Sequence, residues 1–147
     1  MTNLSGKKAL VLGGSRGIGA AVVERLVAEG VAVTFSYFGS EAAASALAAS
    51  TGAVAVRCDS ADREATRALV REQGALDILV AAAGVAAIGA SHELDPDHVD
   101  RMIDINIRSP YHAAVEAAKT MNDGGRIIVI GSVNGDRMPL AIGAAYA

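Results

Sequence analysis

The sequence predicts an α/β fold in which helices cover both faces of a doubly wound parallel sheet. Five short stretches rich in Val, Ile and Leu alternate with helix-like segments along the 147 residues. A helix between successive strands is the connection that parallel pairing requires. The strands also lack the polar alternation of a sheet with one solvated face. With right-handed crossovers, we expect the strand order 3-2-1-4-5.

The first half of the chain contains three expected strands and two expected helices. Apolar and β-branched stretches predict strands at residues 8–13, 31–37 and 53–58. Ile18, Val22 and Leu26 recur at helical spacing until Gly30, which ends the first helix. The alanine-rich stretch 40–50 predicts the second helix.

The second half continues the same alternation. The charged stretch 62–73 predicts a helix, and apolar stretches predict strands at residues 76–82 and, after a turn, within 124–132. Asp95 and Pro96 have the residue types of an N-cap and a first-turn proline. We expect the helix that they begin to reach about Met121, with an interruption at Pro110.

Composition excludes several classes of function. No linker or repeat divides the chain, so residues 1–147 are expected to form one domain. The net charge of −3, with no basic cluster larger than Lys7–Lys8, argues against a nucleic-acid partner. The longest apolar stretch, at 78–90, is too short and too rich in glycine to span a membrane.

The cysteine and histidine residues point to neither a disulfide nor a metal site. Cys58 is the only cysteine, so no disulfide can form within the chain. The three histidines, His92, His98 and His112, share no ligand spacing with each other or with Cys58, and we expect no metal. The N-terminal segment lacks the apolar part of a signal peptide, and we expect a cytoplasmic protein.

A cluster of glycines lies between the first strand and the first helix. Four of them occur within residues 13–19. In the predicted fold this loop lies at the carboxyl edge of the sheet, near the point where the strand order reverses. There the helix N-terminus offers free N–H groups to an anion, and glycine lets the backbone approach a pyrophosphate. The alternative is a turn that binds no ligand.

The sequence "GGSRGIG" at 13–19 resembles the Gly-x-x-x-Gly-x-Gly loop of the short-chain dehydrogenase/reductase family. Gly13, Gly17 and Gly19 match its three glycines, and the absence of a following Gly-Lys-Ser/Thr excludes a P-loop. Five further stretches match family motifs in the correct order: "CDSAD", "AAAGV", "INI", "IGSVNG" and "AAYA". The resemblance therefore covers the whole chain and implies a Rossmann-type fold.

The resemblance implies a nicotinamide coenzyme at the carboxyl edge of the sheet. The residues that it assigns to coenzyme binding are Gly13, Ser15, Arg16, Gly17, Ile18, Gly19, Tyr37, Asp59, Ser60, Ala83 and Gly84. In the family, the acid at the position of Asp59 accepts a hydrogen bond from the adenine amino group. The alternative for Asp59 is simple capping of the next helix. Ala81 and Ala82 stand where the family usually has asparagines, and we expect slightly looser structure there.

The residue types near the end of the second strand favour NADP over NAD. An acid about 20 residues after the glycine loop usually accepts the ribose hydroxyls of NAD. Tyr37 occupies that place, and no acid lies within 34–40. Arg16, inside the loop, can reach the same region and contact a 2′-phosphate. The alternative for Arg16 is an ordinary solvated arginine.

The resemblance also implies hydride transfer between NADP(H) and a small carbonyl or alcohol substrate. Ser132 would polarise the substrate oxygen, Tyr146 would give or take the proton, and Asn106 would belong to a proton relay. Pro110 lacks an N–H group, so it leaves the Asn106 carbonyl free to hold a water. The alternative is an ordinary proline kink.

The chain ends one residue after Tyr146, before the position of the family's lysine. We therefore expect that the carboxyl-terminal part of the family fold is missing and that this chain alone does not turn over. The alternative function is a regulatory module that binds NADP or a cyclic dinucleotide without catalysis. Full-length relatives are expected to be homo-oligomers.

Overall fold

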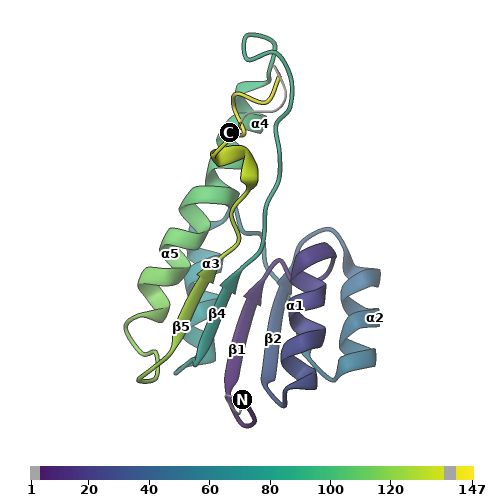
Figure 1. Ribbon diagram of the computed structural model, residues 1–147, viewed down its shortest axis with the longest axis vertical. Coiled ribbons are helices and arrows are strands. Elements are labelled where there is room, and N and C mark those ends of the chain that lie inside the picture. The colour runs from purple at the N-terminus through teal and green to yellow at the C-terminus, as the bar shows by residue number, and fades with distance from the viewer. Residues whose placement is uncertain (1–3, 138–141) are drawn as a thin grey trace.

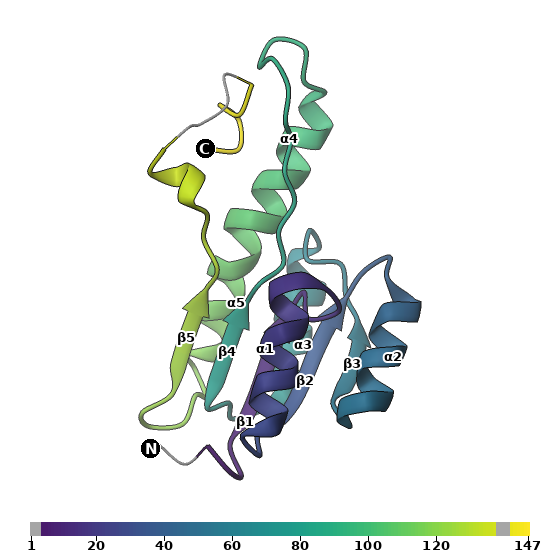
Figure 2. The ribbon, with the colours of Figure 1, turned by 45° about the vertical axis from the view of Figure 1, so that its right-hand side comes forward.

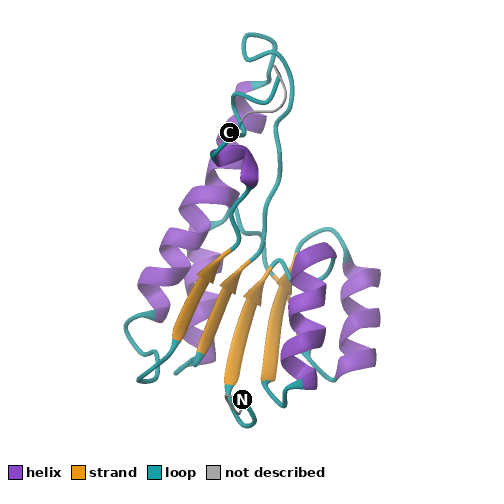
Figure 3. Cartoon of the chain, in the orientation of Figure 1, coloured by secondary structure: helices purple, strands orange, loops and turns teal. Residues whose placement is uncertain are grey.

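The computed structural model describes residues 4–137 and 142–147, and it contains a five-stranded parallel sheet. Figure 3 shows strands of this sheet in orange with helices in purple beside them. The strands are β1 (Lys8–Leu12), β2 (Ala32–Tyr37), β3 (Val54–Arg57), β4 (Ile78–Ala81) and β5 (Arg126–Val129). Their order is β3-β2-β1-β4-β5. The strand order predicted from the sequence is therefore confirmed.

Helices cover the sheet on both sides (Figure 2). They are α1 (Gly17–Ala28), α2 (Glu41–Thr51), α3 (Arg63–Gln73), α4 (Pro96–Ile103) and α5 (Ser109–Ala117). One apolar core lies between the sheet and α1 and α2, and a second lies between the sheet and α3 and α5. Successive residues of β1 alternate between them: Val11 belongs to the first core, and Leu10 and Leu12 to the second.

The sequence predicts strands that are buried on both faces, but not all of the strands are. β1 and β4 are, but Ile127, Ile128 and Val129 of β5 are exposed. In the described part of the chain, β5 pairs only with β4, so one of its edges and much of its surface lack a neighbour. An apolar hollow of about 310 Å³, lined by Leu26, Ile78 and Ile128 among others, lies beside it.

The helical segment that begins at Asp95 is continuous but changes its winding. Asp95 caps α4 by accepting a hydrogen bond from the Asp97 N–H (3.0 Å). A π-helical turn, Asp104–Arg108, then joins α4 directly to α5. The predicted interruption at Pro110 is thus a π-helical turn just before the proline. Proline has no N–H group and cannot donate the α-helical hydrogen bond to the carbonyl four residues earlier. The segment formed by α4 and the loop after β4 projects beyond the carboxyl edge of the sheet (Figure 1).

Two carboxylates tie distant parts of the fold together. Glu116 of α5 is buried and accepts hydrogen bonds from Lys119 and from Arg67 of α3, both at 3.0 Å. These two cations hold the pKa of Glu116 below its ordinary value. Asp77 accepts hydrogen bonds from the Lys7 side chain and the Lys8 N–H group, both at 2.9 Å, and its pKa is lowered for that reason.

The helices within residues 4–137 and 142–147 were compared with the length and apolar character of a membrane-spanning helix. None of them has the length and apolar character needed to cross a bilayer.

Candidate functional site

A crevice of about 520 Å³ opens at the carboxyl edge of the sheet. It lies where the strand order reverses, between the ends of β1, β2, β3 and β4 and the helix α4. Residues that the sequence assigns to coenzyme binding line it: Gly13, Ser15, Arg16, Gly17, Tyr37, Asp59, Ser60, Ala83 and Gly84. Ile18 and Gly19, which the sequence also assigns to coenzyme binding, lie in the first turn of α1 and do not line the crevice; Ile18 is exposed and Gly19 is buried.

The glycine loop packs tightly against the end of β4. Gly13 has a φ of +76°, and a Cβ on it would lie 2.5 Å from the Ala83 Cα, far inside van der Waals contact. The Gly13 N–H donates to the Ser36 hydroxyl (3.0 Å), and the Gly14 N–H donates to the Ser36 carbonyl (2.9 Å). Because these two amides are already bonded, they serve to fix the loop rather than to bind a ligand.

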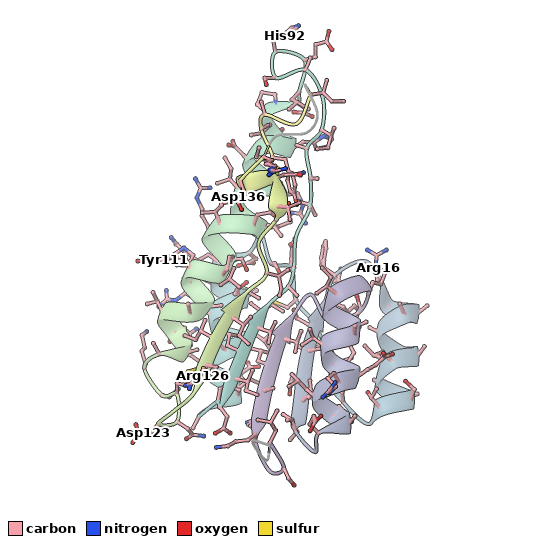
Figure 4. The ribbon with its side chains drawn as sticks, in the orientation of Figure 1. Arg16, His92, Tyr111, Asp123, Arg126 and Asp136 are labelled. Atoms are coloured by element: carbon pink, nitrogen blue, oxygen red, sulfur yellow. The ribbon has the colours of Figure 1, made fainter. Side chains whose placement is uncertain are left out.

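The N-terminus of α1 is open towards the crevice. Arg16 is its N-cap, and the Arg16 side chain forms no capping hydrogen bond with any described residue. The first N–H groups of a helix have no partner within the helix and carry the positive end of its dipole. By contrast, Asp62 and Asp95 cap α3 and α4 with their own carboxylates. The start of α1 can therefore receive an anion, and Figure 4 shows Arg16 near this end of the helix.

The end of β2 carries aromatic side chains where an acid would select NAD. Tyr37 pairs in register with Arg57 of β3. The next residue, Phe38, contacts two cations: the guanidinium carbons of Arg57 and Arg101 are 4.9 and 5.6 Å from its ring centroid. Two guanidinium groups therefore gather around Phe38, and one of them, Arg101, lines the crevice.

Asp59 forms a bridge across the crevice rather than a helix cap. Its Oδ1 accepts a hydrogen bond from the Ala61 N–H (2.9 Å), and the Arg101 Nη2 lies 3.1 Å from both carboxylate oxygens. The cap of α3 is Asp62, which accepts from the Ala65 N–H. The capping alternative for Asp59 is therefore wrong, because α3 begins at Arg63, four residues later, with Asp62 as its N-cap.

Asn106 holds the loop that follows β4. Its Oδ1 accepts from the Val85 N–H (2.9 Å), and its Nδ2 donates to the Val85 carbonyl (2.8 Å). The loosening expected from Ala81 and Ala82 is countered by this pair and by the Ala82 N–H, which donates to the Leu12 carbonyl (2.9 Å). The predicted role of the Asn106 carbonyl in holding a water stays a prediction.

Ser132 and Tyr146 each form hydrogen bonds with neighbouring residues rather than with one another in the described part of the chain. Ser132 is exposed, and its hydroxyl accepts from the Asn134 N–H (3.2 Å) at the start of a short 3₁₀ turn. The Tyr146 N–H donates to the Gly143 carbonyl (3.0 Å). Within the residues described, no hydrogen bond joins the two side chains, and 138–141 lie outside that part of the chain. Their catalytic roles remain predictions.

Sequence reasoning missed several residues of the crevice. They are Ser36, Phe38, Cys58, Ala82, Val85, Arg101 and Ile105. Most of them are sequence neighbours of the strand-end residues that the sequence assigns to coenzyme binding. Including one or two more residues at each strand end would therefore have identified them. Arg101 had no such signal, because it comes from a helix 42 positions beyond Asp59.

Burial raises the pKa of the Cys58 thiol.

The described residues provide no metal centre. Across 4–137 and 142–147, no group of three His, Cys, Asp or Glu side chains could hold an ion.

Comparison with known proteins decides the family. The model of the short chain dehydrogenase family matches residues 7–147. The chain belongs to the short-chain dehydrogenase family. It is 58% identical to the cyclic-di-GMP-binding biofilm dispersal mediator protein of Escherichia coli, over all of this chain and 62% of that protein.

Solved structures of the family share the fold closely. The crystal structure of BdcA in complex with NADPH has a TM-score of 0.97 at 58% identity, over 99% of this chain and 60% of that one. A short chain dehydrogenase from Burkholderia cenocepacia in complex with NADP has a TM-score of 0.94 at 40% identity, over 99% and 63%. This chain therefore spans about three fifths of the length of these relatives.

Proposed function

We propose that this short-chain dehydrogenase chain binds NADP(H) in the crevice and takes part in hydride transfer to or from a carbonyl or alcohol. The observation that carries the proposal is the uncapped N-terminus of α1 facing a crevice without a carboxylate at Tyr37. Two relatives of the same fold were solved with NADPH or NADP, which supports the same coenzyme here.

The residues present fit such a coenzyme. A Cβ on Gly13 would meet Ala83, and a Cβ on Gly19 would lie 2.1 Å from the Gly13 carbonyl oxygen, so a side chain at either position would displace the loop that leads into the first turn of α1. The first-turn amides of α1 would hold the diphosphate, and Arg16 would contact the 2′-phosphate. When bound, the nicotinamide supplies or accepts the hydride.

The protein's part in the chemistry would be to position the substrate oxygen and move one proton. We assign the first task to Ser132 and the second to Tyr146, by their match to the family pattern. Asn106 would act as a positioning residue, because its carboxamide fixes the backbone of Val85 beside the crevice.

The test is equilibrium binding followed by turnover. NADPH fluorescence titrations should show saturable binding to a single site, tighter than that of NADH. If the folded protein shows no saturable binding of either coenzyme, the proposal is wrong. If NADH binds more tightly than NADPH, the proposed choice of coenzyme is wrong. A panel of carbonyl compounds, followed by loss of NADPH absorbance, then tests turnover, which Tyr146→Phe should abolish.

A second candidate is a regulatory module that binds a cyclic dinucleotide. The name of the Escherichia coli relative, which is 58% identical, favours it. The two candidates separate in one experiment, in which cyclic-di-GMP is titrated into the chain with and without NADPH. Saturable binding of the cyclic dinucleotide without turnover of any carbonyl would support the module, and the reverse result would support the reductase.

We propose that copies of this chain associate with one another through α5. Tyr111 and Val115 of α5 and Ile107 of the π-helical turn before it follow one another at intervals of four residues and are 64%, 47% and 63% exposed. Figure 4 shows Tyr111 pointing away from the sheet. A row of exposed apolar side chains at helical spacing is typical of a contact between copies.

A further inference from the structure

Met102 of α4 holds the loop after β4 through its sulfur atom. The Ala87 N–H donates to the Met102 Sδ at 3.3 Å, and both residues are buried. One helical turn further along the chain, the Asn106 Oδ1 accepts from the Val85 N–H (2.9 Å). A thioether is a weak acceptor, but a buried N–H group without any partner costs free energy, so this sulfur does more than fill space.

The spacing of the two acceptor side chains matches that of the two amides. N–H groups two residues apart in an extended chain point to the same side and lie about 6–7 Å apart. Side chains four residues apart on a helix lie on one face, about 6 Å apart along its axis. Figure 2 shows the loop running beside α4. Met102 and Asn106 therefore take the place of the neighbouring strand with which an extended segment would otherwise pair.

The same loop is hydrogen-bonded to the segment that carries Tyr146. The Gly89 N–H donates to the Ile142 carbonyl (2.9 Å). The carbonyl of the next residue, Gly143, accepts from the Tyr146 N–H (3.0 Å). Hydrogen bonds and short stretches of backbone thus connect the sulfur of Met102, through the loop, to the turn on which Tyr146 lies.

We propose that Met102 is a positioning residue for Tyr146. Its sulfur fixes the Ala87 amide, the loop then presents the Gly89 N–H at a defined place, and that group holds the segment of Tyr146. The inference rests on the proposed function, in which Tyr146 moves the proton of the hydride transfer. An apolar side chain of similar volume would fill the same space and accept no hydrogen bond, so packing and positioning can be separated by experiment.

The first link is tested by Met102→Leu, which nearly keeps the volume and removes the acceptor. In ¹⁵N-labelled protein we expect the amide signals of Ala87, Gly89 and Tyr146 to shift, and the Ala87 amide to exchange with solvent about fivefold faster. Met121→Leu is the matched control. The Met121 side chain packs against the second core, and within residues 4–137 and 142–147 its sulfur accepts no hydrogen bond. It should leave the three amide signals unchanged.

The second link is tested by Gly89→Pro, which removes the N–H group that reaches the C-terminal segment. We expect the Tyr146 amide signal to shift while the Ala87 amide keeps nearly its wild-type exchange rate. Gly89→Ala is the control, because it retains the N–H group. Its Cβ would lie 2.9 Å from the Leu94 Cδ2, the end of a flexible side chain that can turn away. This variant should leave the Tyr146 signal close to that of the wild type.

Each result supports the inference or overturns it, and thermal unfolding shows which variants are folded. If Met102→Leu leaves the Tyr146 signal unchanged, or alters it no more than Met121→Leu does, Met102 only packs and the inference is wrong. If Met102→Leu does not fold, an unshifted Tyr146 signal in Gly89→Pro still overturns it. These measurements need no coenzyme. Failure of the wild-type chain to bind NADPH would therefore overturn the proposed function separately from the link between Met102 and Tyr146.

Discussion

The carboxamide of Asn106 forms hydrogen bonds in both directions with the backbone of Val85. Its oxygen accepts at 2.9 Å and its nitrogen donates at 2.8 Å, across 21 positions of sequence. This pair joins the π-helical turn between α4 and α5 to the loop that leaves β4. It therefore fixes the wall of the crevice that faces the glycine loop, since Val85 lines the crevice and Ala83 contacts Gly13.

Asn106→Ala should weaken both the fold and the site. Loss of two partly exposed hydrogen bonds is expected to lower the free energy of unfolding by about 1–2 kcal/mol and to weaken NADPH binding. Urea unfolding and NADPH titration measure the two effects. Asn106→Asp keeps the acceptor for the Val85 N–H but places a negative charge near the Val85 carbonyl. The unfolding free energy of this variant should therefore lie between those of the wild type and Asn106→Ala. Unchanged stability in Asn106→Ala would contradict the assigned role.

Gly19→Ala should be destabilising although it lies within a helix. Alanine normally stabilises an open helical position by about 1 kcal/mol relative to glycine. Here the new Cβ would lie 2.1 Å from the Gly13 carbonyl oxygen, and the loop must shift. We expect a loss of roughly 1–3 kcal/mol in urea unfolding, together with loss of NADPH binding. Gly131→Ala, where no atom lies within 4 Å of the added Cβ, should change neither quantity.

Tyr37→Asp should reverse the preference between the two coenzymes. A carboxylate at the end of β2 would repel a 2′-phosphate and accept the ribose hydroxyls of NAD. We expect NADPH affinity to fall by about tenfold or more while NADH affinity is kept or increased. Tyr37→Phe, which removes only the hydroxyl, should leave the ratio of the two dissociation constants near that of the wild type. A parallel loss for both coenzymes in Tyr37→Asp would argue for damage to the fold.

Stability should fall in acid partly because of Glu116. Lys119 and Arg67 hold its native pKa below the ordinary value of 4.5. The stabilisation is therefore complete above about pH 4.5 and is lost as the pH falls through the native pKa. Glu116→Gln should be less stable at neutral pH and should show a smaller decline of the unfolding free energy between about pH 5 and 3. Glu24→Gln, at an exposed position of α1, should keep the wild-type slope.

Tyr111→Glu should reduce self-association. Sedimentation velocity of the wild-type chain should show a species larger than a monomer, and the variant should shift towards the monomer because a charge enters the apolar row of α5. A monomeric wild-type chain, or an unchanged distribution in the variant, would count against α5 as the contact.

The strand pattern and the glycine loop were predictable because they depend on local sequence. Apolar runs, Gly30 and the Asp95–Pro96 cap specify where elements begin and end, and the crossover rule then orders the strands. The contacts between elements were not predictable in this way. The Arg101–Asp59 pair depends on how far α4 projects, and the exposure of β5 depends on what packs beside it.

The loop also shows why residue type alone cannot assign a role to each glycine. The sequence assigns Gly13 to coenzyme binding, and the structure places it in the crevice with its N–H group bonded to Ser36. The free donors are those of the first turn of α1, a distinction that only the positions of β2 and Ser36 reveal. Likewise, Ser132 and Tyr146 match a motif, but a motif does not place two side chains together.

The most direct test of this account is to follow the backbone amides of the ¹⁵N-labelled chain by NMR during titration with NADPH. We expect saturable shifts that centre on Gly17, Ile18 and Gly19 and extend to the strand ends at Tyr37, Asp59 and Gly84. Folded protein that shows no saturable shift, or shifts confined to residues away from the start of α1, would contradict the claim that this helix terminus binds the coenzyme.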